Sequence, residues 1–193
     1  MADHAHVFAA DLSSRQQARQ LVDSTTEALG GLDLLVLSAG TFENVSYDAI
    51  DDDTWDRTLD LNLAAPFAVA HRATGALKQS RGNIVFVTCS SVIRPFRGYL
   101  PYVVAKAGVY QLMRALAMQL APEVRVNAVA PGMVLPPEDM GPQQIERVAE
   151  QSLLRSVGNP DDVVRAVIYL ASSPFVTGEQ LVVDGGRSLA RPS

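Results

Sequence analysis

Two side chains that can move a proton lie one helical turn apart near the middle of the sequence. Tyr102 and Lys106 are separated by Val-Val-Ala, and residues four apart point to one face of an α-helix. A free tyrosine has a pKa of about 10, and a nearby ammonium group favours its phenolate form. The N-terminus of a helix adds positive potential at the same end. The pattern therefore predicts a proton donor and acceptor that works near neutral pH.

Alternating apolar runs and helical patterns predict the frame that positions this pair. Ser13 or Ser14 is expected to cap the first helix, and Gly30 to end it. Parallel strands with intervening helices form a doubly wound α/β sheet, whose ligand lies at the carboxyl ends of the strands. Strands are expected at 7–10, 32–37, 83–88, 124–129 and 180–184, and helices at 14–29, 53–77, 101–120, 143–151 and 160–172.

The composition argues against several other classes of protein. The chain has 193 residues, of which 48% are hydrophobic and 19% charged, and this favours one folded domain over disorder. The net charge of −5 gives no electrostatic attraction for nucleic acid or an anionic membrane, and no apolar run is long enough to span a bilayer. One cysteine and three histidines at unsuitable spacing predict no disulfide and no metal site. The start lacks a signal-peptide pattern, so a cytoplasmic location is expected.

Longer motifs place the tyrosine and lysine in a known context. Residues 81–109 read RGNIVFVTCSSVIRPFRGYLPYVVAKAGV, residues 124–132 read VRVNAVAPG, and residues 176–189 read VTGEQLVVDGGRSL. With Leu59-Asp-Leu-Asn62-Leu upstream, these motifs follow the order of the classical short-chain dehydrogenase/reductase family, which the chain resembles across essentially its whole length. The resemblance implies a Rossmann-type fold and an NAD(P)-dependent oxidoreductase that acts on a small carbonyl or alcohol substrate.

The resemblance also implies a catalytic set. The family uses an Asn, a Ser, a Tyr and a Lys, and Asn62, Tyr102 and Lys106 match three of them. Tyr102 would pass the proton to or from the substrate, Lys106 would lower the tyrosine pKa and bind the nicotinamide ribose, and Asn62 would hold a water. Cys89 stands where the family has its Ser. A thiol is a weak hydrogen-bond donor, so Ser90 or Ser91 stays open as a substitute, as does simple packing of Cys89.

The cofactor site is implied in the same way. Tyr102 and Lys106 would contact the nicotinamide end, and NAD and NADP both stay open because the residues that discriminate between them are absent. The remaining cofactor-binding residues that the resemblance implies are Asp11 and Leu12 at the adenine, Ala39 and Gly40 after a strand, and Pro131, Gly132 and Val134 around the nicotinamide.

Other parts of the family pattern are missing from this sequence. Family members begin with a strand, a Gly-rich turn, a helix and a second strand, and this sequence begins at what would be the third strand. The backbone amides that would hold the pyrophosphate are therefore not encoded. In the strand order 3-2-1-4-5-6, this isolates residues 7–10 and leaves residues 34–37 as an open edge. A start upstream of Met1, a fragment and a degraded relative stay open. The expected unit is one truncated domain over 1–193.

The finer identity rests on three short segments. Residues 94–99, 135–138 and 184–189 resemble bacterial pteridine-reductase-type members, which often carry an Asp where Cys89 stands. Simple ketones and 3-oxoacyl thioesters therefore stay open as substrates beside pterins. Residues 133–159 are expected to form the substrate loop.

A second class of function is a non-catalytic scaffold that acts only through oligomer contacts. The helices at 53–77 and 102–120 are the family's usual subunit contacts, so a homodimer or homotetramer is expected.

Overall fold

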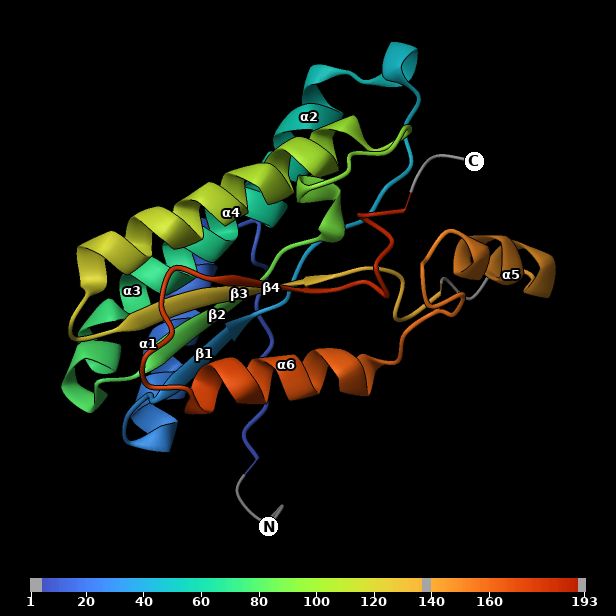
Figure 1. Ribbon diagram of the computed structural model, residues 1–193. Helices are drawn as coiled ribbons and strands as arrows, with labels where there is room; N and C mark the ends of the chain where they lie inside the picture. The colour runs from blue at the N-terminus through green and yellow to red at the C-terminus, as the bar shows by residue number, and fades with distance from the viewer. Residues whose placement is uncertain (1–4, 137–139, 191–193) are drawn as a thin grey trace.

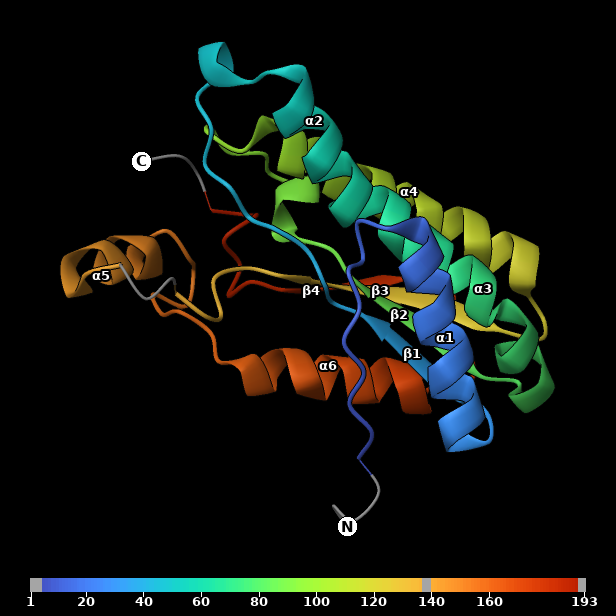
Figure 2. The same ribbon diagram turned by 180° about the vertical axis from the view of Figure 1, so that it is seen from behind.

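The computed structural model describes residues 5–136 and 140–190 and arranges them as a parallel sheet with helices on both faces (Figure 1). Helices α1, α3 and α4 cover one face, and α6 covers the other (Figures 1 and 2). The predicted α/β fold with a doubly wound parallel sheet is confirmed. Within the described residues, the strands are β1 (Leu34–Leu37), β2 (Asn83–Val87), β3 (Arg125–Pro131) and β4 (Gln180–Val183), in that spatial order, and the longer helices are α1 (Arg15–Leu29), α3 (Ala65–Ser80), α4 (Leu100–Leu120) and α6 (Pro160–Ser172).

The helix ends follow capping residues that can be read from the sequence. The Ser14 hydroxyl accepts a hydrogen bond from the Gln17 amide at the start of α1, and Gly30 ends this helix with φ of 73°. Asn159 caps α6 by accepting from the Asp161 amide, while the Asp162 carboxylate accepts from the Asn159 amide. These local bonds set where each helix leaves the sheet.

The central strands carry the core because both of their faces are covered. Ile84 and Phe86 of β2 point into the larger cluster beneath α1, α3 and α4, whereas Val85 points into the smaller cluster beneath α6. All three side chains are completely buried. The continuous apolar run of β2 therefore marks a strand with helices on both sides, as in other parallel sheets.

The outer strand departs from the sequence-based expectation. Residues 32–37 were expected to form a strand covered on both faces, but Leu34 and Val36 of β1 are 37% and 41% exposed. β1 pairs with β2 and has no neighbour among the described residues on its other side. The open edge that the strand order predicted is therefore confirmed.

The expected strand at 7–10 is wrong. These residues form no strand, and Val7 is 94% exposed. A strand exists through hydrogen bonds to a neighbouring strand, and this segment pairs with neither edge strand of the described sheet, β1 or β4. Apolar composition alone could not supply the missing partner.

The long helix expected at 53–77 contains an interruption that the sequence did not reveal. α2 (Asp52–Leu59) leads into a π-helical turn at Asp60–Ala64, which then continues as α3. A π-helical turn inserts one residue into the helical repeat and is frequent at functional sites. Here it carries Asn62.

The sequence predicts neither a membrane-spanning segment nor a metal site, and the structure can be searched for both. Over the described ranges, no helix is long and apolar enough to cross a membrane, and no group of three or more His, Cys, Asp or Glu side chains is arranged to hold a metal ion. His4, one of the three histidines, lies outside the described residues, as do Pro137 and Glu138 of the 135–138 segment.

Candidate active site

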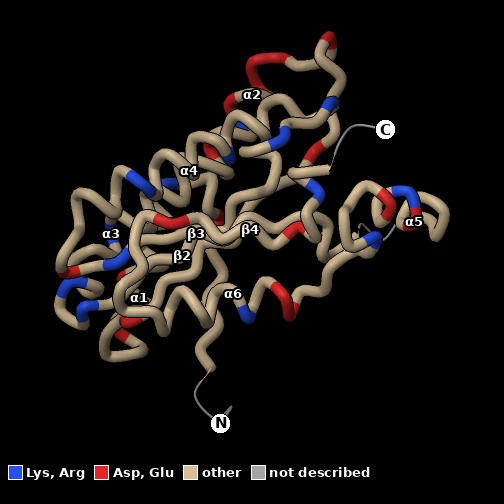
Figure 3. Tube along the Cα trace, in the orientation of Figure 1, with Lys and Arg blue, Asp and Glu red and all other residues tan. Residues whose placement is uncertain are grey.

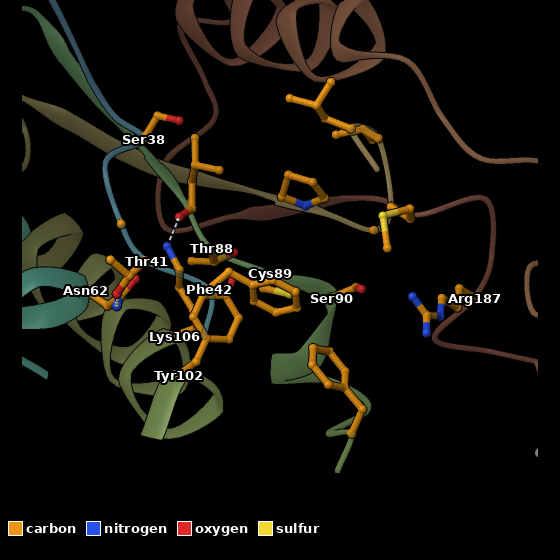
Figure 4. Close-up of a pocket in the computed structure, with 18 residues that line it drawn as sticks. Ser38, Thr41, Phe42, Asn62, Thr88, Cys89, Ser90, Tyr102, Lys106 and Arg187 are labelled. Atoms are coloured by element: carbon orange, nitrogen blue, oxygen red, sulfur yellow. Dashed lines mark hydrogen bonds between the residues drawn. The ribbon is translucent and has the colours of Figure 1, made fainter. Parts of the chain in front are cut away.

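A cavity of about 270 Å³ opens at the carboxyl ends of the strands, where the topology predicts a ligand. Its walls come from the segments after β1, β2 and β3, from the start of α4 and from the C-terminal segment (Figure 4). We call it the Tyr102 cavity. The residues expected at the site that line it are Gly40, Asn62, Cys89, Tyr102, Lys106, Pro131, Gly132 and Val134.

The first turns of α4 bring Tyr102 and Lys106 to one wall of this cavity. Pro101 lies in the first turn of the helix, where its missing N–H is tolerated. The Lys106 ammonium lies 5.6 Å from the centre of the Tyr102 ring and donates a hydrogen bond of 2.9 Å to the Val87 carbonyl (Figure 4). Lys106 is almost fully buried. This bond to the end of β2 fixes the cation beside the phenol.

The electrostatics of the pair differ from the expectation that Lys106 lowers the tyrosine pKa. Burial raises the pKa of Tyr102 strongly, and the neighbouring Cys89 raises it further. Burial also lowers the pKa of Lys106, and Cys89 partly opposes that shift. The net shift of the Tyr102 pKa is therefore upward, because burial disfavours the charged phenolate. Tyr102 is held in its protonated form.

The π-helical turn places Asn62 at the back of the cavity. Its side-chain nitrogen donates to the Thr58 carbonyl at 3.0 Å and to the Thr41 hydroxyl at 3.1 Å. Its side-chain oxygen, Oδ1, is completely buried and has no hydrogen-bond partner among the described residues. A buried, unpaired acceptor is costly, so this oxygen points to a bound donor such as a water.

Gly40 approaches Asn62 so closely that only a glycine fits. A Cβ atom built on Gly40 would overlap Asn62 Oδ1 and lie 3.7 Å from the Lys106 ammonium. The glycine therefore lets the loop after β1 close over two of the expected catalytic side chains.

Cys89 occupies the position expected for the family's serine, and it lines the cavity together with Tyr102 (Figure 4). The sulfur accepts a hydrogen bond of 3.4 Å from the Ser91 amide. Ser90 also lines the cavity, whereas the Ser91 hydroxyl is buried and has no partner among the described residues. Of the two alternatives to Cys89, only Ser90 is therefore placed at the cavity.

Three expected cofactor residues lie elsewhere. Leu12 and Ala39 line a separate cavity of about 160 Å³ beside β1 and α3. The exposed Asp11 carboxylate accepts hydrogen bonds from the Ser13 amide and hydroxyl, and these bonds lower its pKa. The structure therefore does not bring these three residues to the Tyr102 cavity.

The sequence reasoning missed the aromatic and cationic parts of the wall. Phe42, Phe96 and Arg187 line the cavity, beside Met133 and Leu135 of the expected substrate loop. Phe96 and Arg187 stand inside segments that carried the resemblance, but nothing in their spacing marked them as cavity residues. Phe42 directly follows Gly40-Thr41, and this position after β1 was the only available signal.

The sequence also matches known proteins over most of its length. Residues 1–188 match a family model described as enoyl-(acyl carrier protein) reductase. Ketoacyl reductase 2 of the granaticin polyketide synthase of Streptomyces violaceoruber is 36% identical over 188 residues, which are 93% of this chain and 76% of that protein. Dehydrogenase/reductase SDR family member 4 of Homo sapiens is 32% identical over 182 residues, 89% of this chain and 65% of the relative.

Solved structures give the same result. The ligand-free aldohexose dehydrogenase of Thermoplasma acidophilum superposes with a TM-score of 0.92 at 26% identity, covering 100% of this chain and 82% of the other. A short-chain dehydrogenase/reductase from Brucella melitensis superposes with a TM-score of 0.89 at 32% identity, covering 94% of this chain and 76% of the other. This chain thus spans only part of the length of each of these proteins.

Proposed function

This chain belongs to the classical short-chain dehydrogenase/reductase family, and from that premise we propose that it transfers hydride between NAD(P)H and a small carbonyl or alcohol substrate in the Tyr102 cavity. The chain is an oxidoreductase by its relatives. The observation that carries the proposal for this cavity is the meeting of Asn62, Cys89, Tyr102 and Lys106 around one opening. These four residues come from three separate segments, so their meeting is a property of the fold.

The proton step falls to Tyr102. Its hydroxyl is protonated in the buried cavity, so it can donate to a carbonyl oxygen that gains negative charge during reduction. Lys106, anchored on the Val87 carbonyl, stabilises the phenolate that remains. Asn62 Oδ1, which has no partner among the described residues, would accept a hydrogen bond from a water. That water would belong to the relay that returns a proton to Tyr102. Cys89 would donate only a weak hydrogen bond to the substrate oxygen, because a thiol is a poor donor.

The residues present fit the nicotinamide half of the cofactor. Gly40 leaves room beside the unpaired Asn62 Oδ1, and Pro131, Gly132 and Val134 line the same cavity. Lys106 and Tyr102 would hold the ribose and nicotinamide there. The nicotinamide, when bound, supplies or accepts the hydride. Asp11 and Leu12 would serve the adenine half, Ala39 precedes Gly40 in the segment after β1, and NAD and NADP both stay open as the cofactor.

Residues 1–193 by themselves are expected to bind NAD(P)H weakly. No Gly-rich helix N-terminus lines the Tyr102 cavity among the described residues, and such a terminus is the usual cradle for a pyrophosphate. Titration followed by nicotinamide fluorescence should show weak binding. Reduced nicotinamide mononucleotide, which lacks the adenylate half, should bind within about tenfold of the dinucleotide, since tenfold is only about 1.4 kcal/mol. Tight saturable binding of NAD(P)H alone would contradict this prediction.

The proposed substrate is a carbonyl or alcohol compound, and the relatives do not narrow its chemical class further. Ketoacyl and 3-oxoacyl-[acyl-carrier-protein] reductases are among them. The pterin alternative is carried by residues 94–99 and 184–189, and Cys89 weighs against it because a thiol replaces the Asp of that group's proton relay. The scaffold alternative predicts no turnover on any panel of ketones, acyl thioesters and pterins, so one such panel separates all three. A cytoplasmic location fits a cofactor-dependent enzyme of this kind.

A homo-oligomer is also proposed, with α4 as one contact. Val104, Ala107, Ala115 and Met118 are exposed on one face of this helix, with Gln111 and Arg114 among them, and Met118 is 83% exposed. Lys106 and Arg114 are the charged residues of α4 (Figure 3). Light scattering should give a dimer or tetramer. Ala107→Glu should shift the mass toward the monomer because it places a charge in an apolar contact. The matched control Gln16→Glu, on exposed α1, should not. A monomeric parent, or an unchanged mass for Ala107→Glu, would remove α4 as the contact.

A further inference from the structure

One side of the Tyr102 cavity is an aromatic cluster. Phe42 stacks on Tyr99 with ring centres 4.1 Å apart and meets Tyr102 edge-on at 4.9 Å. Phe96 adds an edge contact to Tyr99 at 5.2 Å. Phe42, Phe96 and Tyr102 themselves line the cavity, and offset or edge-on ring packing is the geometry that aromatic groups favour. The cluster therefore presents an apolar aromatic wall, made of ring faces and ring edges, beside the proposed proton donor.

A second, smaller cavity continues from this surface. It has a volume of about 160 Å³ and shares Ser90, Phe96 and Arg187 with the Tyr102 cavity. We call it the arginine cavity, because Arg94 and Arg187 both line it and its described lining includes no aspartate or glutamate. The two cavities are therefore neighbours that share an aromatic ring and a guanidinium group in their walls.

Contacts around the arginine cavity hold Arg187 in place without neutralising it. The Arg94 guanidinium donates to the Arg187 carbonyl at 3.0 Å, and this fixes the backbone of the C-terminal segment. The Arg187 guanidinium donates to the neutral side chain of Gln151 at 2.8 Å. The neighbouring Asp184 carboxylate instead accepts from the backbone amides of Gly186 and Ser188. Figure 4 shows the Arg187 guanidinium turned from its backbone toward the cavity.

We propose that the substrate joins a flat apolar ring to a carboxylate, with the ring against Phe42 and Phe96 and the carboxylate on Arg187 in the arginine cavity. The inference rests on the proposed function, because it places the reacting carbonyl at Tyr102, which Phe42 meets edge-on. A guanidinium presents paired donors that match a carboxylate. Sites that combine apolar walls with one fixed charge bind ligands in one orientation. Arg187 is then a specificity-determining residue.

The test is calorimetric binding of non-reacting acids to the purified chain. Benzoate, phenylacetate, 3-phenylpropionate and 4-phenylbutyrate vary the distance between ring and carboxylate, and the corresponding amides remove the charge. We expect at least one acid to bind saturably and at least tenfold more tightly than its amide, since charge-assisted hydrogen bonds carry this much. Arg187→Gln should remove that preference, and Arg187→Lys should restore part of it.

The control is Arg19→Gln, which makes the same change in net charge on exposed α1, outside both cavities. It should keep the preference for the acid. Equal binding of every acid and amide, or an unchanged preference in Arg187→Gln, would overturn the inference. Turnover separates this result from the proposed function. Reduction of uncharged ketones without acid binding leaves the reductase standing and removes the carboxylate site. Acid binding without turnover of any ketone leaves the carboxylate site standing and removes the reductase.

Discussion

Tyr102→Phe is expected to lower kcat for carbonyl reduction by at least about 10²–10⁴-fold, the usual contribution of general acid–base catalysis. The phenol is the group in the cavity that can hand a proton directly to a substrate oxygen. Its pKa is raised by burial, so it is protonated throughout the neutral range, and reduction by the parent should show no loss of rate there as pH rises.

The loss should be confined to the chemical step. The substitution keeps the ring and its edge contact with Phe42, so the unfolding temperature and the affinity for NAD(P)H should change little. Steady-state oxidation of NAD(P)H at saturating cofactor, with a panel of ketones and pterins, measures it. Near-parent kcat in Tyr102→Phe would refute the catalytic assignment.

Cys89→Ser is the matched variant at the same wall and should act in the opposite direction. It restores a stronger hydrogen-bond donor while keeping nearly the same volume. Activity on a simple ketone should hold or rise by up to about tenfold, the equivalent of one ordinary hydrogen bond. A loss of tenfold or more would show that the thiol has a role of its own, and the substrate class would then have to be reconsidered.

The sequence predicted most helices and the central strands because their signals are local. Ser14, Gly30 and Asn159 form caps through bonds to residues a few positions away. The apolar run at 83–88 predicts a buried strand, which the structure has at Asn83–Val87, and α6 at 160–172 was predicted to the residue. The strand at 7–10 failed because strand formation depends on a partner that the local pattern does not contain.

The site was predictable only in part, for a similar reason. Tyr102 and Lys106 lie on one helix, so their spacing alone places them together. Asn62, however, reaches the cavity through a π-helical turn, and the continuous helical pattern of residues 53–77 gives no sign of it. The raised Tyr102 pKa arises from burial by residues distant in sequence. Arg187 and Phe42 are brought together by tertiary packing, which no motif records.

Gly40→Ala is expected to lower kcat/KM by about 10²-fold, the loss that a misplacement of about 1 Å produces in a catalytic site. The new Cβ atom would overlap Asn62 Oδ1, and one of the two must move. Asn62 is held by its bonds to Thr58 and Thr41, so either its amide turns away or the loop after β1 lifts. Both movements disturb the side of the cavity proposed for the nicotinamide.

A double-mutant cycle identifies the cause of this loss. If the overlap with Asn62 is responsible, Gly40→Ala should cost little further activity in an Asn62→Ala background, where the amide is gone and the added methyl group fits. Strong non-additivity is the expected sign of direct contact between the two positions. Fully additive losses would show instead that Gly40 acts independently of Asn62.

Gly75→Ala is the control, because nothing lies within 4 Å of its added Cβ. Gly75 lies on the exposed side of α3, so an alanine there should leave activity unchanged and raise the free energy of unfolding by about 0.5–1 kcal/mol. Replacing glycine by alanine would therefore stabilise α3 at Gly75, which faces open space, and disable the site at Gly40, which faces Asn62.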